Sequence, residues 1–336
     1  MQRIVAKLAQ RYAVDVAQEA DTAQIFQVYN AVRPDTRLQQ RFQRRFHHKY
    51  LENPYAKGLE SILVCRDGNR LIGFAGMMDF DLWYHDRLIP ATFSIDLAVL
   101  PAYQGVGVGY LLLKRTCERQ VIVMDGHLNE AAQRLAERMG GREIAPCTVL
   151  RRWSHPADLF YTWKDRAFNI EENAKIDARF DQLWDTARAA YEVIGVRDQA
   201  ALAWKFKMYP LRRFVVYTLC HGQQLVAYVV TTMERLQGVA RKGILVDYLC
   251  AAISPAMQAT FLSFVLGRLA RQGALCVDVI ATHHKMFDLF TSLGFVSKGH
   301  NPHFMVYTNT MTEGKIDLWQ ARTWYLTFGD SDFYLT

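Results

Sequence analysis

The chain of 336 residues repeats itself, because segments of its first half recur in its second half at a nearly constant separation. Lys49 begins a Lys-aromatic pair shortly before a proline, and Lys205 begins the same pattern 156 positions later. Gly68 lies in a polar turn between two apolar stretches, and Gly222 lies in the matching turn 154 positions later. A duplicated unit of about 150 residues has the usual size of one domain. The repeat therefore predicts two similar units in tandem.

The apolar periodicity follows the same order in both units: a helix, two alternating strands, a third strand, a long helix, a buried strand, a short helix and a final strand. In the first unit we expect strands at 61–66, 70–78, 92–99, 121–125 and 144–151, and helices at 35–50, 107–119 and 129–139. In the second unit we expect strands at 213–220, 224–232, 242–250, 275–280 and 303–308, and helices at 198–207, 255–272 and 284–292. This order predicts a mixed α/β (α+β) fold.

The repeat sets the expected domain limits at 1–155 and 156–310, followed by a C-terminal tail at 311–336. The stretch that connects the halves, 153–197, has a largely helical pattern. The tail is rich in aromatic residues and is too apolar for a free terminus. We therefore expect it to pack on the body of the protein.

A glycine-rich loop follows the third apolar strand of the first unit. Gly105, Gly107 and Gly109 remove Cβ atoms where a backbone could approach phosphate, and the helix that follows presents unpaired N–H groups at its start. This arrangement predicts a pyrophosphate site. Tyr110 stands where a dinucleotide fingerprint and a P-loop each need a small residue, so the spacing excludes both of those motifs.

The segment Gln104-x-x-Gly107-x-Gly109 resembles the Q/R-x-x-G-x-G/A motif of the GCN5-related N-acetyltransferase (GNAT) family. The preceding Val99-Leu100-Pro101 is similar to the family's V-x-P, and Asn129, Ala132 and Leu135 resemble its second cofactor segment. The resemblance implies two tandem GNAT-type domains, each a mixed, mostly antiparallel sheet flanked by helices, with acetyl-CoA as co-substrate and no metal. It implies cofactor contacts from Leu97, Ala98, Val99, Gln104, Gly105, Val106, Gly107, Val108, Gly109 and Asn129.

The second unit contains no glycine in the equivalent stretch, 253–260. Its backbone could not approach phosphates in the same way, so we expect a single cofactor site, in the first unit. The chain is similar in this respect to tandem family members in which one half works and the other helps to build the interface and the acceptor pocket.

Acyl transfer to an amine needs a group that removes a proton and a stabilised thiolate leaving group. Asp96 is the carboxylate nearest to the loop, and either serves as that base or caps neighbouring backbone N–H groups. The family's acid is often a Tyr, but Ala136 occupies its place here. Either Tyr110 or Tyr103 then supplies the proton, or the thiolate leaves unassisted.

The acceptor is expected to be a small-molecule amine bound between the halves. Segments around Asn53 and Asp330 resemble stretches of bacterial tandem members associated with surface-polysaccharide synthesis, which implies an amino sugar and an acceptor pocket lined by these two side chains. Turn formation accounts equally well for both residues.

Two other classes of protein remain open. A Fem-like transferase has duplicated units of this fold but takes its aminoacyl group from tRNA; the net charge of +7 favours it, whereas the intact loop opposes it. A non-catalytic acyl-CoA-binding protein is the other, and the missing Tyr favours it.

The composition and the charge pattern indicate whether membranes, metals or nucleic acids are expected as partners. Charged residues interrupt the apolar N-terminal segment before it reaches signal-peptide or membrane-span length, so we expect a cytoplasmic protein without a membrane partner. The six cysteines are far apart, and the adjacent histidines of 47–48 and 283–284 point apart, which favours free thiols and no metal site. The basic stretch 41–50 fits an amphipathic helix with a solvated basic face, so we expect no nucleic-acid partner. The sequence indicates no oligomeric state.

Overall fold

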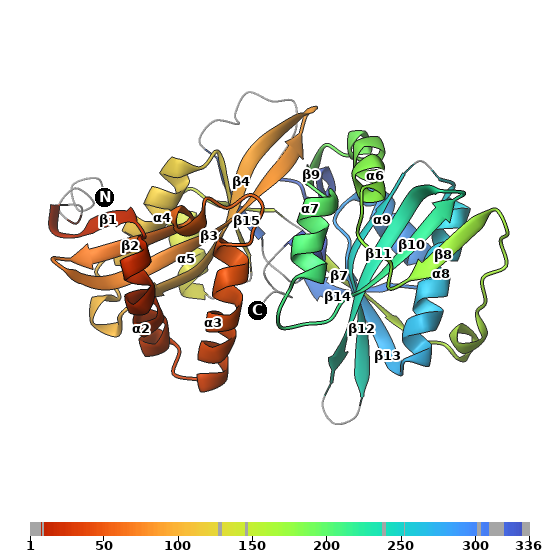
Figure 1. The fold of residues 1–336 in the computed structure, drawn as a ribbon, viewed down its shortest axis with the longest axis horizontal. Helices are drawn as coiled ribbons and strands as arrows, with labels where there is room; N and C mark the ends of the chain where they lie inside the picture. Colours follow the sequence, from red (N-terminus) through yellow and green to blue (C-terminus); the bar gives the residue numbers. More distant parts are fainter. Residues whose placement is uncertain are drawn as a thin grey trace.

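The structure, a computed structural model, describes residues 8, 10–126, 130–144, 147–236, 240–251, 253–300, 304–308 and 319–330. Two sheets lie side by side (Figure 1), one with the strand order β1-β2-β3-β4-β5-β15-β6 and the other with β14-β7-β13-β12-β11-β10-β8. Most neighbouring strands are antiparallel, and helices cover both sheets. The expected fold class is confirmed.

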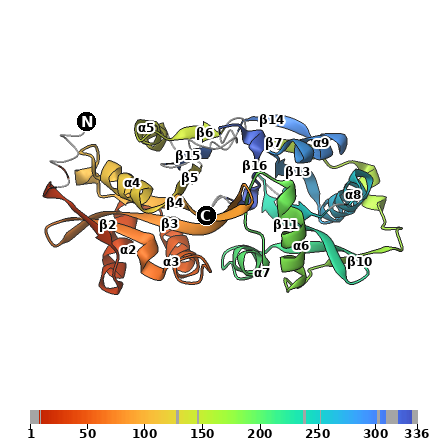
Figure 2. The same ribbon diagram turned by 90° about the horizontal axis from the view of Figure 1, so that it is seen from above.

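The first sheet is built mainly from the first half of the chain. Its strands are β1 (Ala13–Val16), β2 (Ile62–Asp67), β3 (Arg70–Tyr84), β4 (Arg87–Val99), β5 (Ile122–Gly126), β6 (Arg142–Ile144), β9 (Val193–Gly195), β15 (Phe304–Thr308) and β16 (Trp324–Tyr325). Figure 2 shows α2 (Thr22–Val32) and α3 (Thr36–Tyr50) on one face and α4 (Val108–Arg119) and α5 (Glu130–Arg138) on the other. Helix α3 begins where the Asp35 carboxylate accepts the Arg37 N–H at 2.7 Å. It buries Phe42, Phe46 and Tyr50, spaced one turn apart, in the core.

The second sheet repeats this plan. Its strands are β7 (Thr148–Trp153), β8 (Phe168–Glu172), β10 (Val215–His221), β11 (Gln224–Arg235), β12 (Arg241–Cys250), β13 (Ala274–Ile280) and β14 (Val296–His300). One face carries α6 (Arg179–Ala187) and α7 (Gln199–Leu202), and the other carries α8 (Pro255–Arg271) and α9 (His284–Ser292) (Figures 1 and 2). Strands β12 and β13 run parallel, as β4 and β5 do in the first sheet.

The two sheets exchange one strand each. Strand β7 was expected to close the first unit but pairs with β13 and β14 of the second sheet. Strand β15 was expected to close the second unit but pairs with β5 and β6 of the first. The apolar pattern fixes where a strand forms and which face it buries, but it does not specify the partner strand. A division of the chain after residue 155 would therefore separate β7 from the second sheet, and would separate β9, β15 and β16 from the first.

The described part of the tail, 319–330, joins both cores. Strand β16 pairs with β9, and β9 pairs with the far end of β3, so these short strands extend the first sheet. Trp324 lies in the core of the first sheet, whereas Tyr325 and Phe328 lie in the core of the second. Successive side chains of a strand point to opposite faces, which explains why the neighbours Trp324 and Tyr325 pack in different cores.

Candidate active site

A cavity of about 770 Å³ opens in the first unit where β4 and β5 separate. The two parallel strands pair from Ala91 and Ile122 to Phe93 and Met124, where the described ladder ends. Residues 94–99 of β4 and residues 125–126 at the end of β5 then line the cavity instead of pairing with each other. Backbone polar groups that lose their strand partner are open to a ligand.

Strand β4 carries a β-bulge at this point. The register against β3 shifts between Phe74 and Gly76, so that Asp96 and Leu97 together face one residue of β3. Asp96 has a φ of +54°, in the left-handed region that Asp and Asn tolerate best among residues with a Cβ. Bulges of this kind redirect backbone groups near functional sites.

The carboxylate of Asp96 is buried beneath the bulge and paired by helix α3. It accepts hydrogen bonds from Arg45 Nη2 at 3.0 Å, Lys49 Nζ at 3.4 Å and Tyr50 Oη at 2.9 Å. Burial alone would raise the pKa of Asp96, but the charges of Lys49 and Arg45 lower it below the usual value. Asp96 is therefore an ionised carboxylate that binds protons weakly.

The glycine loop adopts the conformation that its sequence demands. Gly105 and Gly107 have φ values of +77° and +103°, and Gly107 caps α4 without a side-chain hydrogen bond. The Gln104 side chain donates to the Val99 carbonyl at 2.9 Å and holds the loop against β4. A Cβ on Gly107 would meet the Leu8 side chain, so this glycine is needed for its backbone angle and not to clear the cavity.

Gly109 keeps the cavity free of a side chain, which is the role expected from the sequence for all three glycines of the loop. It lines the cavity, its φ is not left-handed, and a Cβ there would lie 3.8 Å from Leu135 and 3.9 Å from Leu97. The space above the first turn of α4 is therefore open because Gly109 has no side chain.

The structure brings most, but not all, of the expected cofactor residues to one cavity. The expected cofactor residues on its lining are Leu97, Ala98, Val99, Gln104, Gly105 and Gly109, and Asp96, which was expected to be catalytic, lies with them. Val108 is fully buried in the core, Val106 is 47% exposed, and Gly107 and Tyr110 do not line the cavity. Asn129 lies outside the described residues.

The two tyrosines considered as acids differ in position. Tyr103 lines the cavity and donates to Asp67 Oδ2 at 3.1 Å, a hydrogen bond that raises the pKa of Tyr103.

Ala136 is fully buried, and the main-chain oxygen of Ala136 and the ring of Tyr307 both lie against Gly141. Tyr307 comes from the exchanged strand β15 and donates to Asp125 Oδ2 at 2.8 Å. Asp125 lines the cavity and was missed in the sequence, because only the separation of β4 and β5 exposes the end of β5.

The opposite wall of the cavity comes from α2 and α3 and is basic. Arg33, Arg41 and Arg45 line it together with Tyr29 and apolar side chains. The expected amphipathic helix is present, but its basic face is only partly solvated, because Arg45 is buried against Asp96. The recurrence of the segment around Lys49 in the second half was the one sign in the sequence that this helix does more than face solvent. Lys49 is fully buried and, like Arg45, is paired with Asp96.

Asn53 and Asp330 do not line the cavity. Asn53 donates from Nδ2 to the Asp79 carbonyl at 2.9 Å and accepts the Tyr55 N–H at 3.0 Å, so it stabilises a turn. Asp330 is paired with Arg197 at 2.5 Å in the second half. Turn formation and internal pairing therefore explain both residues without an acceptor.

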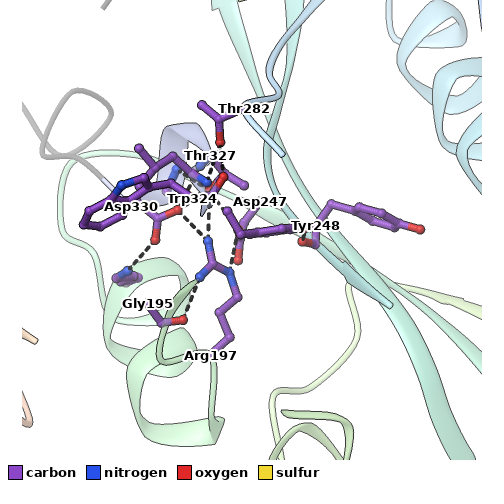
Figure 3. A network of polar contacts seen from close by, with 12 residues as sticks. Gly195, Arg197, Asp247, Tyr248, Thr282, Trp324, Thr327 and Asp330 are labelled. Atoms are coloured by element: carbon purple, nitrogen blue, oxygen red, sulfur yellow. Dashed lines mark hydrogen bonds and ion pairs between the residues drawn. The ribbon is translucent and has the colours of Figure 1, made fainter. Parts of the chain in front are cut away.

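The second half holds an aspartate where the first half holds Asp96. Asp247 lies two residues before the partner of Tyr228, as Asp96 lies two residues before the partner of Phe74. Figure 3 shows how the tail surrounds Asp247: Arg197 Nε donates to it at 3.1 Å, and Thr327 Oγ1 donates to it at 2.9 Å.

The tail packs directly onto this part of β12. A Cβ on Gly329 would approach Phe206 to 2.9 Å and Asp247 to 3.4 Å, so backbone lies where a side chain would not fit. The N-terminus of α8 is also closed, because Ser254 accepts the Met257 N–H at 3.2 Å and Pro255 follows it. Among the described residues, the first half thus has a cavity and a helix N-terminus without a side-chain cap. At the equivalent place in the second half, the tail packs on β12 and Ser254 caps the helix.

The cysteines, the metal-binding residue types and the helix lengths each bear on an expectation from the sequence. Five of the six cysteines are buried, and the sixth is half-buried. No three His, Cys, Asp or Glu side chains lie together as a metal site among the described residues. None of the helices described has the length and apolar character needed to span a bilayer.

Comparison with known proteins gives a family match for a segment that lines much of the cavity. Residues 58–140 match the sequence model of the acetyltransferase (GNAT) domain family, a stretch that includes β4, the glycine loop and α4. A search of curated protein sequences gave no match.

Solved structures extend the likeness to most of the chain. A GCN5-related N-acetyltransferase from Anabaena variabilis has 14% identity and a TM-score of 0.66, over 89% of this chain and 73% of its own. One from Kribbella flavida has 16% identity and a TM-score of 0.61, over 88% and 71%. An N-myristoyltransferase from Saccharomyces cerevisiae with bound myristoyl-CoA has 11% identity and a TM-score of 0.55, over 88% and 82%. These TM-scores show a shared fold, and at identities this low the likeness concerns the fold alone.

Proposed function

Because residues 58–140 match the sequence model of the acetyltransferase (GNAT) domain family, we propose that this protein is an acyl-CoA-dependent acyltransferase that moves an acetyl group from acetyl-CoA to the amine of a small molecule. One observation carries the proposal: a left-handed glycine loop and an uncapped helix N-terminus border a cavity between two separated parallel strands. Each of these features supplies backbone N–H groups to an anionic, extended ligand.

The diphosphate of the cofactor binds the N–H groups of the loop and of the first turn of α4, since these have no acceptor within the helix. The rest of the cofactor extends between β4 and β5 and takes the hydrogen bonds that the two strands do not make with each other. The thioester then lies at the bulge of β4, where backbone N–H groups polarise its carbonyl. The glycine loop supports this assignment over the tRNA-dependent alternative.

In the transfer, the neutral amine forms a bond to the acetyl carbon, and the carbon–sulfur bond breaks. The amine loses one proton, and the departing CoA thiolate gains one, so the products are the acetylated amine and CoA. We assign the removal of the amine proton to Asp125, which lines the cavity at the end of β5.

Asp96 has a different role in this proposal. Its pKa is lowered and its oxygens are bound by three side chains of α3. A carboxylate of this kind holds the bulge in its left-handed conformation and thereby positions the backbone that contacts the thioester. Asp96 is therefore a positioning residue.

The cofactor site is tested by calorimetric titration with acetyl-CoA, followed by thiol-release assays over amines and amino sugars. Gly109→Val places a side chain in the cavity without a strained backbone, so we expect affinity for acetyl-CoA to fall at least about tenfold, in the range of lost charge-assisted hydrogen bonds. Ala256→Val is the matched control, because Ala256 is the exposed second residue of α8, as Gly109 is of α4. Equal affinity in wild type and Gly109→Val would refute the site.

A further inference from the structure

The wall of the cavity formed by α2 and α3 carries two exposed guanidinium groups. Arg33 follows the last residue of α2, and Arg41 lies in α3 one turn before Arg45. Both line the cavity that also contains Asp96. Burial raises the pKa of Tyr29, and the charges of Arg45 and Arg33 partly oppose that rise, so the tyrosine lies close to both arginines.

The carboxylates of the cavity are engaged elsewhere. Asp96 is paired with Arg45 and a buried lysine, and Asp125 accepts a hydrogen bond from a buried tyrosine. In the described part of the chain, no carboxylate lies within ion-pair distance of Arg33 or Arg41. Two positive charges thus face the cavity, and none of the carboxylates described in the structure pairs with them.

These two arginines lie away from the phosphate-binding end. Helices α2 and α3 cover one face of the sheet, whereas α4 and the glycine loop before it lie on the other face (Figure 2). A diphosphate held at the start of α4 is therefore on the side opposite Arg33 and Arg41. This placement leaves the two arginines free of the diphosphate and available to a second substrate in the same cavity.

We infer that the acceptor of this enzyme is a small amine that also carries an oxyanion, a carboxylate or a phosphate, which Arg33 and Arg41 bind. This inference rests on the proposed function and adds the charge of the substrate to it. The planar guanidinium fork matches both oxyanions, and two such groups on one wall favour an acceptor anchored by its charge. Val32 and Leu38 beside them would contact the apolar part of the molecule.

The test measures binding to the complex with CoA, which occupies the glycine loop and keeps phosphate probes away from it. The probes are two matched pairs: glucosamine 6-phosphate with glucosamine, and 4-aminobutyrate with its amide. We expect the charged member of at least one pair to bind at least about tenfold more tightly than its neutral partner. The pair that shows the difference identifies the oxyanion as phosphate or carboxylate.

Variants assign that difference to the two arginines. The double variant Arg33→Gln, Arg41→Gln should remove the preference and leave the dissociation constant of CoA unchanged, and Arg41→Lys should retain part of it. Arg44→Gln removes the same charge from an exposed position of α3 outside the cavity and should change neither value.

Three outcomes would overturn the inference: charged probes that bind no better than neutral ones, a preference that survives the double variant, or a double variant that weakens CoA instead. The proposed function fails by a different result, because an absence of acetyl-CoA binding to the wild-type protein would be seen before any acceptor is added.

Discussion

Replacement of Asp96 by Asn tests whether Asp96 positions the backbone of β4 or acts as a catalytic base. The substitution keeps the shape of the side chain and a residue type that tolerates the φ of +54°, but it removes the charge that faces Arg45 and Lys49. At 3.0 and 3.4 Å, each attraction is about 5 kcal/mol at an effective dielectric constant of about 20. Relief of the desolvation of Asp96 offsets part of this loss, and breaking a buried ion pair costs about 3–5 kcal/mol in total.

We therefore expect urea unfolding of Asp96→Asn to show a free energy of unfolding lower by about 3–5 kcal/mol, a large share of the usual ~5–15 kcal/mol. Asp15→Asn, at an exposed position of β1, is the control and should change it by less than about 0.5 kcal/mol. If Asp96→Asn unfolded like wild type and yet lost its turnover, Asp96 would be a base and our reasoning would be wrong.

The same cluster sets a pH dependence. Because the pKa of Asp96 is lowered in the folded protein, its contribution is present above the ordinary value of 3.8 and is lost as pH falls through the folded-state pKa below it. The free energy of unfolding of Asp96→Asn should consequently fall less steeply below about pH 4 than that of wild type. Equal slopes in denaturation curves recorded over this range would contradict the assigned direction.

Further substitutions test other parts of the structure. Asp125→Asn should lower kcat by about 100-fold or more, with acetyl-CoA affinity unchanged in calorimetry, because it removes the proposed proton acceptor; an unaltered kcat would exclude that role. Gly107→Ala should lower the free energy of unfolding by about 1–2 kcal/mol in urea, because its φ of +103° disfavours a Cβ, whereas a neutral effect would mean that the loop can rearrange. Asp330→Asn should destabilise the second half by about 3–5 kcal/mol, since Arg197 loses a buried partner at 2.5 Å, and a weakened acetyl-CoA complex in this variant would contradict a cofactor site confined to the first half.

Local pattern was sufficient to place most helices and strands. The strands β3 and β4 and the helix α8 follow from alternation, turn glycines and Pro255. Helix α2 was not expected, although Ile25, Val28, Tyr29 and Val32 have helical spacing that could have revealed it.

The candidate site could be predicted only where one segment builds it. The glycine loop is continuous in sequence, so its residues were found together. Asp125, Arg33 and Arg41 reach the same cavity from three other segments, and no local pattern encodes that meeting. The bulge at Asp96 also interrupts alternation, so strand periodicity gives the wrong face for the residues around it.

The exchange of β7 and β15 has a consequence for how this protein is made. The first sheet receives its strand at Phe304–Thr308 only after the strands of the second sheet up to β14 have been synthesised, so the first half cannot finish folding at the ribosome before its neighbour has emerged. A gene fragment that ends between the halves would yield a sheet with a bare edge beside β5, prone to aggregate. Each half therefore needs the other to complete its sheet.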